Sequence, residues 1–312
     1  MEWAYLLNYS PGKRKKIVLF ACMVVIVYQG VHTLPKMNRV LHGLSTILTN
    51  KSTTRVATVP VIDPVESTYD SRRASEKRLE KSALECVKHK IVYNRTISTV
   101  LVSNEYRVII NVIPKVGSGT WKRLMRGIDP TSANAKGRRR LNFLKSSEYD
   151  QYVSGVFFRE PLERLVSFYH FIISPHSTTH FNHYHKYIRT ENGNGTTDNE
   201  PTFSQLVQMI IDHGQVPPHS RHWERQYLLS RICEFNYTFV GHMNHLSQDA
   251  PYFVHIAFGD AAHYPVVHEK KGEDKFRKTM STLSQTLIDR LIDYYRLDYE
   301  ILGFEIPDLS KK

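Results

Sequence analysis

The chain has 312 residues, of which 41% are hydrophobic and 23% are charged, and its formal net charge is +12. These fractions are those of an ordinary globular protein, so they exclude a chain that lacks a hydrophobic core. The excess of positive charge favours an anionic partner, and by itself it does not choose among nucleic acid, anionic lipid, a phosphorylated cofactor and an acidic polysaccharide.

A basic block at 13–16 stands directly before a short apolar run at 17–28. This pair is typical of a cleaved signal peptide or of an uncleaved signal anchor. No convincing small-x-small cleavage site follows, so we expect an anchor over 17–35. The positive-inside rule then leaves a cytoplasmic tail at 1–16 and the rest of the chain in the lumen. The short span suits the thin membranes of the early secretory pathway.

The segment at 36–78 is rich in Ser, Thr, Val and Pro, has no sustained periodicity, and is predicted to be a lumenal stem. A charged, helix-prone stretch at 75–89 leads into a folded domain at 79–312. In an oxidising lumen two thiols usually pair, so Cys86 and Cys233 are predicted to form a disulfide. Glycosylation sequons on the lumenal side begin at Asn50, Asn94, Asn194 and Asn236.

Strand-like and helix-like segments alternate along this domain. Apolar, β-branched runs predict buried strands at 107–113, 151–159 and 237–241. Helices are predicted from residue 121 onward and at 161–173, 202–213, 246–258 and 283–295. This order favours an α/β fold with a mostly parallel central sheet flanked by helices. The polar insert at 174–200 is expected to be a loop over the site.

The first chemical motif, PKVGSGTW at 114–121, lies between a predicted strand and a predicted helix. Small residues let backbone N–H groups approach a phosphate, and the helix N-terminus adds positive potential. Ser118 and Thr120 can donate hydrogen bonds, and Lys115 supplies a cation. The P-loop of NTPases ends in Gly-Lys-Ser/Thr, which is absent here, so an ATPase or GTPase is disfavoured. The alternative is a turn with an incidental lysine.

The second motif, REPLERLVSFY at 159–169, follows the next predicted strand. Arg159 leaves the sheet at its C-terminal edge, where ligands bind in open α/β folds. Ser167 lies two helical turns beyond Pro161, within reach of the same anion. We assign structural roles to Glu163 and Arg164, with an ordinary surface pair as the alternative.

These motifs resemble those of the Golgi carbohydrate sulfotransferases that include the chondroitin/dermatan 4-O and HNK-1 enzymes. PKVGSGTWKR is similar to that family's PKVGCTNWKR loop, which binds the 5′-phosphosulfate. The segment from Arg159 is similar to its 3′-phosphate element, RDPFERLVSxY. The segments at 219–224 and 237–249 resemble its H-W and YDxVGKxETLxxD segments. The resemblance runs from about residue 80 to the C-terminus.

The resemblance implies a P-loop-NTPase-like sulfotransferase fold and 3′-phosphoadenosine 5′-phosphosulfate (PAPS) as sulfuryl donor. The donor-binding residues that it carries over are Lys115, Val116, Gly117, Ser118, Gly119, Thr120, Trp121, Arg159 and Ser167. Sulfuryl transfer needs in-line positioning and stabilisation of charge on the leaving phosphate, and we assign the second task to Lys115. His222 is the first choice for the base that accepts the acceptor's proton, followed by Glu224 and Glu163.

Several positions depart from the family pattern. The family's Cys-Thr-Asn is Ser118-Gly119-Thr120, and a second family cysteine is Ser230. We infer that Ser118 and Ser230 replace a cysteine pair lost together, which leaves Cys86 and Cys233 as the remaining bridge. The family's Gly-Lys is Gly241-His242. These differences bear on the acceptor more than on the donor.

The expected function is therefore PAPS-dependent sulfation of a glycosaminoglycan, with the 4-position of N-acetylgalactosamine in chondroitin or dermatan favoured. The expected location is the Golgi membrane, as a single-pass type II protein, and a homo-oligomer is allowed. A non-catalytic lumenal polyanion-binding protein on the same fold is the main alternative. A nucleic-acid-binding protein is disfavoured by the anchor and the sequons.

Two further clusters of charged or metal-ligating residues lie in the predicted domain. His180, His183 and His185 lack the complete ligand set of a zinc motif, so no metal site is expected. The basic run at 136–140 is either a polyanion contact or a solvated charge run.

Overall fold

The structure is a computed structural model, and it describes residues 69–93, 99–130, 133–135, 149–173, 188, 201–214, 220–265 and 273–309. Several predictions fall outside these residues: the tail and anchor at 1–35, the stem as far as 68, the basic run at 136–140, the three histidines at 180–185 and three of the sequons, those at Asn50, Asn94 and Asn194. Within the described ranges, no helix is long and apolar enough to cross a membrane.

The described strands form one five-stranded sheet in the order β3-β1-β2-β4-β5. Their bounds are Thr99–Ser103 (β1), Val108–Val112 (β2), Ala133–Ala135 (β3), Val153–Phe158 (β4) and Phe239–His242 (β5). The neighbours β2, β4 and β5 are parallel, as predicted, whereas β1 runs antiparallel to both β2 and β3. The sheet is therefore mixed and not mostly parallel. Only the turn at 104–107 separates β1 from β2. So short a connection can join antiparallel strands, whereas parallel strands need a long crossover.

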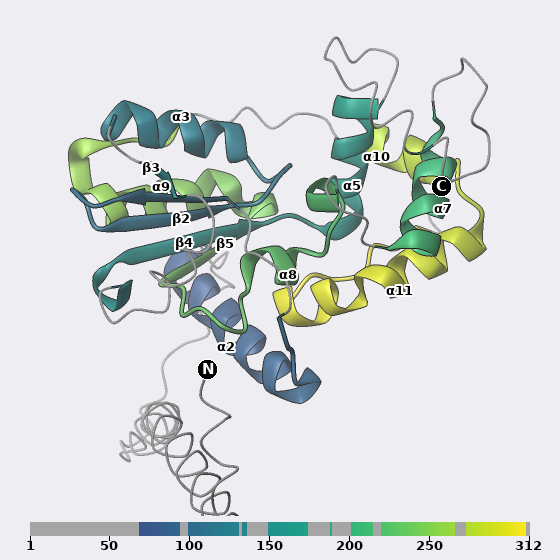
Figure 1. Cartoon of the computed structure of the whole chain (residues 1–312), viewed down its shortest axis with the longest axis horizontal. Coiled ribbons are helices and arrows are strands. Elements are labelled where there is room, and N and C mark those ends of the chain that lie inside the picture. Colours follow the sequence, from purple (N-terminus) through teal and green to yellow (C-terminus); the bar gives the residue numbers. More distant parts are fainter. Residues whose placement is uncertain are drawn as a thin grey trace, which may run out of the picture. The chain divides into compact units, whose positions relative to one another are not determined.

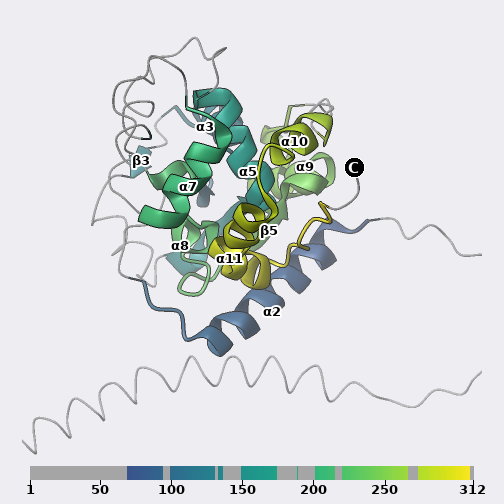
Figure 2. The same cartoon turned by 90° about the vertical axis from the view of Figure 1, so that its right-hand side faces the viewer.

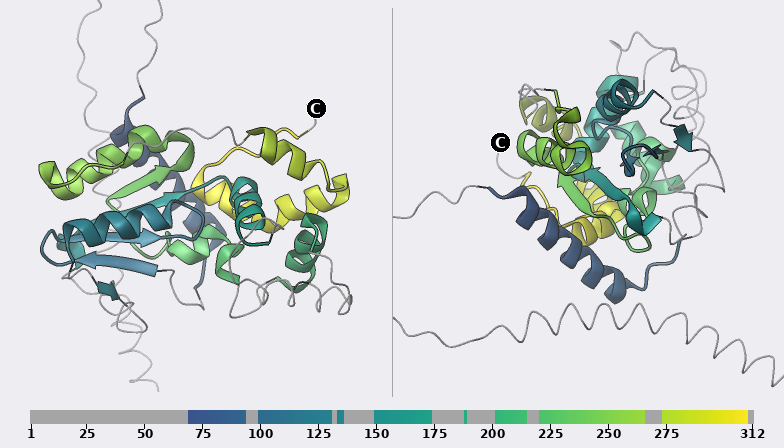
Figure 3. Two further views of the ribbon diagram at one scale, coloured as in Figure 1. Left: turned by 90° about the horizontal axis from the view of Figure 1, so that it is seen from above. Right: turned by 90° about the vertical axis from the view of Figure 1, so that its left-hand side faces the viewer.

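Helices α3 (Ser118–Ile128) and α9 (Leu246–Phe258) lie over the same face of the sheet (Figures 1 and 3). The ring of Phe157 from β4 packs between them, 4.8 Å from Trp121 of α3 and 5.9 Å from Phe253 of α9, measured between ring centroids. A Cβ at Gly155 would collide with the ring of Phe253, so only glycine allows α9 to approach β4 this closely. The helix predicted at 246–258 has these bounds in the structure.

A second core lies among the C-terminal helices, which Figure 2 shows from their side. Helix α5 (Pro161–Phe168) continues as a π-helix over Tyr169–Ile173. It packs with α7 (Phe203–His213), α10 (Glu273–Met280) and α11 (Gln285–Leu302). The predicted helices at 161–173 and 202–213 are confirmed, and the one predicted at 283–295 extends to Leu302. The shorter elements are 3-10 turns at Tyr149–Gln151, Ser220–His222, Met243–His245 and Gly259–Ala261, and helix α8 at Gln226–Ser230.

Helix α2 (Ser71–His89) runs along the outer edge of β5, which is the last strand on that side among those described (Figure 1). Val240 points its N–H and its carbonyl away from β4, and both groups are satisfied by α2. The N–H donates to Ser75 Oγ at 2.8 Å, and the carbonyl accepts from Arg78 at 3.0 Å. These side chains block further strand pairing at this edge. The folded unit thus includes a helix that begins before residue 79.

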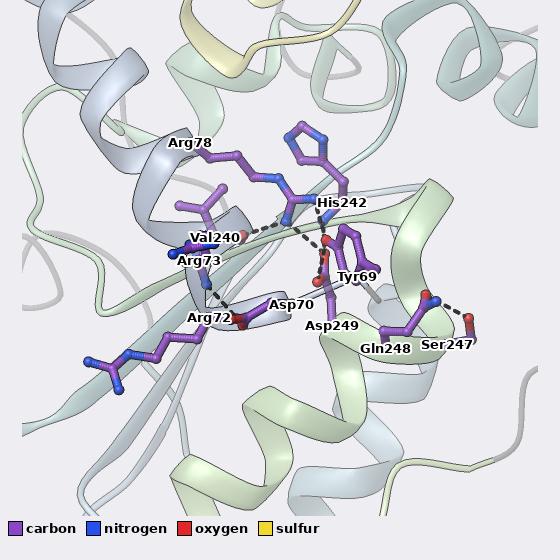
Figure 4. A network of polar contacts seen from close by, with 11 residues as sticks. Tyr69, Asp70, Arg72, Arg73, Arg78, Val240, His242, Ser247, Gln248 and Asp249 are labelled. Atoms are coloured by element: carbon purple, nitrogen blue, oxygen red, sulfur yellow. Dashed lines mark hydrogen bonds and ion pairs between the residues drawn. The ribbon is translucent and has the colours of Figure 1, made fainter. Parts of the chain in front are cut away.

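Arg78 also anchors α2 to α9 (Figure 4). Its guanidinium contacts Asp249 Oδ2 at 2.7 Å and the Tyr69 hydroxyl at 2.7 Å, and that hydroxyl donates to Asp249 Oδ1. Asp249 is fully buried, and it accepts a further hydrogen bond from the backbone N–H of His242. The buried carboxylate is therefore paired and fully hydrogen-bonded, as burial of a charge requires.

The predicted disulfide between Cys86 and Cys233 is present, with Cα atoms 5.4 Å apart. It ties the end of α2 to the segment that follows α8. The sequon that begins at Asn236 lies within the described residues, and Asn236, three positions after Cys233, is exposed.

Candidate functional site

The glycine-bearing motif forms a tight loop between β2 and α3. The backbones of Lys115 and Gly117 both take left-handed conformations, with φ of 70° and 66°. Helix α3 begins at Ser118, three residues before the predicted start, and Gly117 is its N-cap residue. Gly117 has no side chain that could cap this helix end, and no side-chain capping hydrogen bond is made there within the described residues. An uncapped helix N-terminus preceded by such a loop is a site where backbone N–H groups bind an anion.

The ammonium of Lys115 lies at this loop, 3.9 Å from the centroid of the Phe171 ring. Burial, followed by the positive charges of Arg159 and Arg164, lowers the pKa of Lys115 to about 8. Because β2 and β4 are parallel neighbours, their carboxyl ends lie at the same edge of the sheet, and Arg164 Nε donates to the Pro114 carbonyl at 2.9 Å. The structure thus brings the two sequence motifs to one region, where their cations raise each other's affinity for an anion.

Arg159 is held by Glu163, which the sequence analysis assigned a structural role, and by two residues that it did not single out. Its Nε lies 3.2 Å from Glu163 Oε2. Its backbone is bracketed by the buried side-chain amide of Gln226, whose Oε1 accepts from the Arg159 N–H at 3.1 Å and whose Nε2 donates to the Arg159 carbonyl at 2.7 Å. Gln226 is held in turn by Asp298, which accepts its backbone N–H at 2.8 Å.

Asp298 is completely buried at the N-terminus of α8. Burial raises its pKa to about 6, although hydrogen bonds from the N–H groups of Gln226 and Tyr227 act in the opposite direction. These two donors and the helix end stabilise the carboxylate. A chain of contacts from α11 through α8 therefore sets the position of Arg159.

Arg164 is buried, with 1% of its surface exposed, so the surface-pair alternative is wrong for this residue. Its three guanidinium nitrogens donate to the carbonyls of Pro114 at 2.9 Å, Arg221 at 2.8 Å and Glu224 at 2.8 Å. A structural role is therefore confirmed: one side chain joins the start of the phosphate-type loop to the segment that carries His222.

The candidate base His222 lies in the 3-10 turn at Ser220–His222, partly buried, with its ring stacked on that of Phe168 at a centroid separation of 5.1 Å. Ser167 is partly exposed on α5, next to Phe168, and in the described structure no hydrogen bond joins it to Arg159. Glu224 is buried, and its carboxylate accepts the backbone N–H of Arg225 at 2.9 Å. Of the two candidate bases His222 and Glu224, His222 is thus the more accessible.

Two residues carried over as donor-binding have their side chains in the core. Val116 and Trp121 are each 1% exposed, so their side chains support the loop from below. The indole Nε1 of Trp121 is buried without a partner among the described residues, and it lies 3.8 Å from where a Cβ on Gly117 would be. A buried donor directly beneath the loop fits a site that is completed by an anion.

Tyr264 is a further residue at the loop. Burial raises the pKa of this phenol to about 12, and the side chain of Thr120 acts in the opposite direction. Its ring packs against Trp121, with centroids 4.8 Å apart. Beside it, a groove of about 460 Å³ runs along α3, lined in part by Thr120, Arg123 and His263. The sequence held no local signal for Tyr264, because it lies far along the chain from the loop.

One cluster of metal-ligating side chains occurs within the described residues. Glu85, His89 and Glu300 bring their ligand atoms within 4.8 Å of one another where α2 meets α11. His89 Nε2 contacts Glu85 within α2 at 3.3 Å and Glu300 of α11 at 2.5 Å, and Lys88 pairs with Glu85 at 2.8 Å.

Comparison with known proteins places this site in context. A profile of the sulfotransferase family matches residues 98–305, which include both sequence motifs, at 114–121 and 159–169, and the His222 segment. Carbohydrate sulfotransferase 9 of Homo sapiens is 25% identical over 277 residues, covering 78% of this chain and 61% of the relative. Carbohydrate sulfotransferase 11 of Rattus norvegicus is 25% identical over 256 residues, covering 72% of each.

Carbohydrate sulfotransferase 14 of Danio rerio is 23% identical over 236 residues, covering 68% of this chain and 63% of the relative. The chain thus spans less than two thirds of some of the curated relatives that it matches. No solved structure matches it. The profile match covers about two thirds of the sequence, and with it the resemblance carried by the two motifs is confirmed: the chain belongs to the sulfotransferase family.

Proposed function

We propose that this protein transfers a sulfuryl group from PAPS to a hydroxyl of a sugar in an acidic glycan. The observation that carries the proposal is that Lys115 and Arg159 follow the neighbouring parallel strands β2 and β4, and that Arg164 of the second motif donates to the carbonyl of Pro114, next to Lys115, at 2.9 Å. The donor is an extended molecule with anionic groups at two places. Two cationic elements beside an uncapped helix N-terminus match that distribution of charge.

In this proposal the loop at 115–120 holds the 5′-phosphosulfate, and Arg159 with Ser167 holds the 3′-phosphate. The acceptor oxygen attacks sulfur in line with the leaving phosphate oxygen. A new S–O bond forms, the bond to the leaving oxygen breaks, and the negative charge that remains on the phosphate is stabilised by Lys115. His222 accepts the hydroxyl proton.

We further propose chondroitin or dermatan as the acceptor, at the 4-position of N-acetylgalactosamine. Support comes from the motif resemblance and from carbohydrate sulfotransferase relatives at about 25% identity. We place the protein in the Golgi membrane through the anchor at 17–35, with its folded domain in the lumen. The disulfide and the exposed sequon at Asn236 support a lumenal location. Glycosidase-sensitive glycosylation at Asn236 tests that topology, and its absence in a secretory host argues against it.

The decisive experiment incubates the full-length protein with radiolabelled PAPS and a panel of desulfated polysaccharides, followed by disaccharide analysis of the product. We expect label on a glycosaminoglycan. We also expect Lys115→Ala and Arg159→Ala each to abolish transfer without lowering the melting temperature, whereas Arg72→Ala, which alters an exposed ion pair on α2, keeps full activity. Full activity in either site variant contradicts the assignment. A wild-type protein that binds polysaccharide and transfers nothing is the non-catalytic alternative.

A further inference from the structure

Phe171 is an exposed aromatic side chain beside the candidate site. It is 60% exposed, and the other large hydrophobic residues with high exposure in the described ranges are Leu84, Val87, Val92 and Ile306. Singly exposed apolar residues are common and need no function. Phe171 differs from the others because its ring contacts Lys115, the cation assigned to the leaving group.

The contact between the Phe171 ring and the Lys115 ammonium locates the ring relative to the chemistry. The centroid lies 3.9 Å from Nζ, within the range of a cation–π interaction. A donor whose leaving phosphate meets Lys115 would therefore present its sulfur next to this ring. Because the side chain is still 60% exposed, much of its surface remains available to a second molecule.

The backbone around Phe171 is firmly anchored. The residue lies in the π-helix at Tyr169–Ile173, and π-helical turns often occur at functional sites. His170 Nε2 lies 2.7 Å from the Thr279 hydroxyl on α10. Burial, with the charge of Lys275, lowers the pKa of His170 to about 4, so the imidazole stays neutral at physiological pH. Ile173 is completely buried. The flanking residues thus hold the turn in place while Phe171 projects from it.

We propose that Phe171 is an acceptor subsite, where its ring stacks on the apolar face of the sugar that receives the sulfuryl group. A pyranose ring presents a face of C–H groups with its hydroxyls at the rim, and such a face packs on an aromatic ring and leaves the hydroxyls free. Stacking would fix which hydroxyl points at the sulfur, and orientation of this kind contributes to rate. This inference rests on the proposed function and adds to it the residue that positions the acceptor.

The test compares Phe171→Ala and Phe171→Trp with wild type in the full-length protein. Three quantities are measured: KM for desulfated chondroitin, the Kd of 3′-phosphoadenosine 5′-phosphate (PAP), and calorimetric binding of a desulfated chondroitin hexasaccharide to the PAP-loaded protein. Leu84→Ala is the matched control, because Leu84 is 66% exposed on α2. We expect Phe171→Ala to raise both the KM for the acceptor and the Kd of the hexasaccharide by about 3- to 10-fold, the range for one lost aromatic contact. PAP affinity should change less than about twofold.

Phe171→Trp should keep the acceptor binding of wild type, because an aromatic ring remains at this position. Leu84→Ala should match wild type in all three measurements. A changed PAP affinity with unchanged acceptor binding would mean that the ring serves only to cover Lys115, and it would overturn the proposal. So would a Phe171→Ala variant that equals wild type while wild type is active. If wild type transfers sulfuryl to no polysaccharide, the proposed function fails instead. Hexasaccharide binding then decides the role of Phe171. Equal binding by wild type and Phe171→Ala, or no binding by either protein, rejects the subsite.

Discussion

Gln226 holds the backbone of Arg159 with both ends of its side-chain amide, donating to the carbonyl at 2.7 Å and accepting from the N–H at 3.1 Å. This pair of hydrogen bonds continues the pattern of a strand beyond the end of β4. The arginine assigned to the 3′-phosphate therefore leaves the sheet in a set direction. We therefore assign Gln226 a positioning role.

Gln226→Leu should remove this bracket while keeping a similar side-chain volume. The N–H and carbonyl of Arg159 would then lose their partners, so we expect a loss of about 1–3 kcal/mol in the free energy of unfolding. PAP affinity should fall as well, because the guanidinium is no longer directed. Urea unfolding and calorimetry measure the two effects. Gln285→Leu, at an exposed position on α11, is the control and should change neither; equal behaviour of the two variants contradicts the positioning role.

The lowered pKa of Lys115 predicts that donor affinity depends on pH. Its pKa is about 8 in the folded protein, against an ordinary value of 10.5. Above pH 8 the free site therefore loses the positive charge that pairs with a phosphate. A bound anion should restore the ordinary value, so we expect PAP affinity to fall about tenfold between pH 7 and pH 9. Calorimetry over this range measures the effect.

Lys115→Arg is the control for this pH dependence, because a guanidinium keeps its charge throughout the range. Its PAP affinity should be nearly constant with pH, and a fall as steep as that of wild type would assign the titration to another group. The same shift has a consequence for stability. Between pH 8 and 10.5 the unfolded chain binds more protons at this residue than the folded protein, so the contribution of Lys115 to stability rises with pH across that window.

Arg164→Lys should destabilise the protein although it keeps the charge. A compact ammonium cannot reach three carbonyls that come from separate segments, so buried acceptors at Pro114, Arg221 or Glu224 would lose their donor. We expect a loss of about 2–4 kcal/mol and weaker PAP binding, because Pro114 directly precedes Lys115. Thermal and urea unfolding test this. Arg290→Lys, in an exposed ion pair with Asp212, should be nearly neutral, and a loss as large there would show a general intolerance of the exchange.

The disulfide between Cys86 and Cys233 should make a large contribution to stability. It spans a sequence separation of 147 residues, and closing so long a loop restricts the unfolded chain strongly. We expect Cys86→Ser with Cys233→Ser to lower the free energy of unfolding by about 2–5 kcal/mol. Wild type in reductant should behave as this double variant does, and reductant should not affect the double variant further. Cys22→Ser serves as the control and should resemble wild type; a double variant of wild-type stability would contradict the prediction.

Local sequence determined the parts of this protein that depend on neighbouring residues. The buried strands β2, β4 and β5 follow from their apolar runs, and α9 was predicted with the bounds that it has in the structure. The loop from Lys115 to Thr120 was predicted because glycine and lysine between a strand and a helix carry their chemistry locally. The same holds for the arginine at the end of β4.

Only the tertiary structure decided how these parts are supported. The sequence predicted a structural role for Arg164 and left a surface pair open, and its burial is decided by carbonyls from residues 50 to 60 positions away that converge on it. Gln226, Asp298 and Tyr264 carry no motif, since each acts through a partner that is distant in sequence. The strands β1 and β3 were not predicted, and β3, with three residues, is defined by its antiparallel pairing with β1. Hydrogen bonds and packing between remote segments have no local pattern, so they emerge only when the chain is folded.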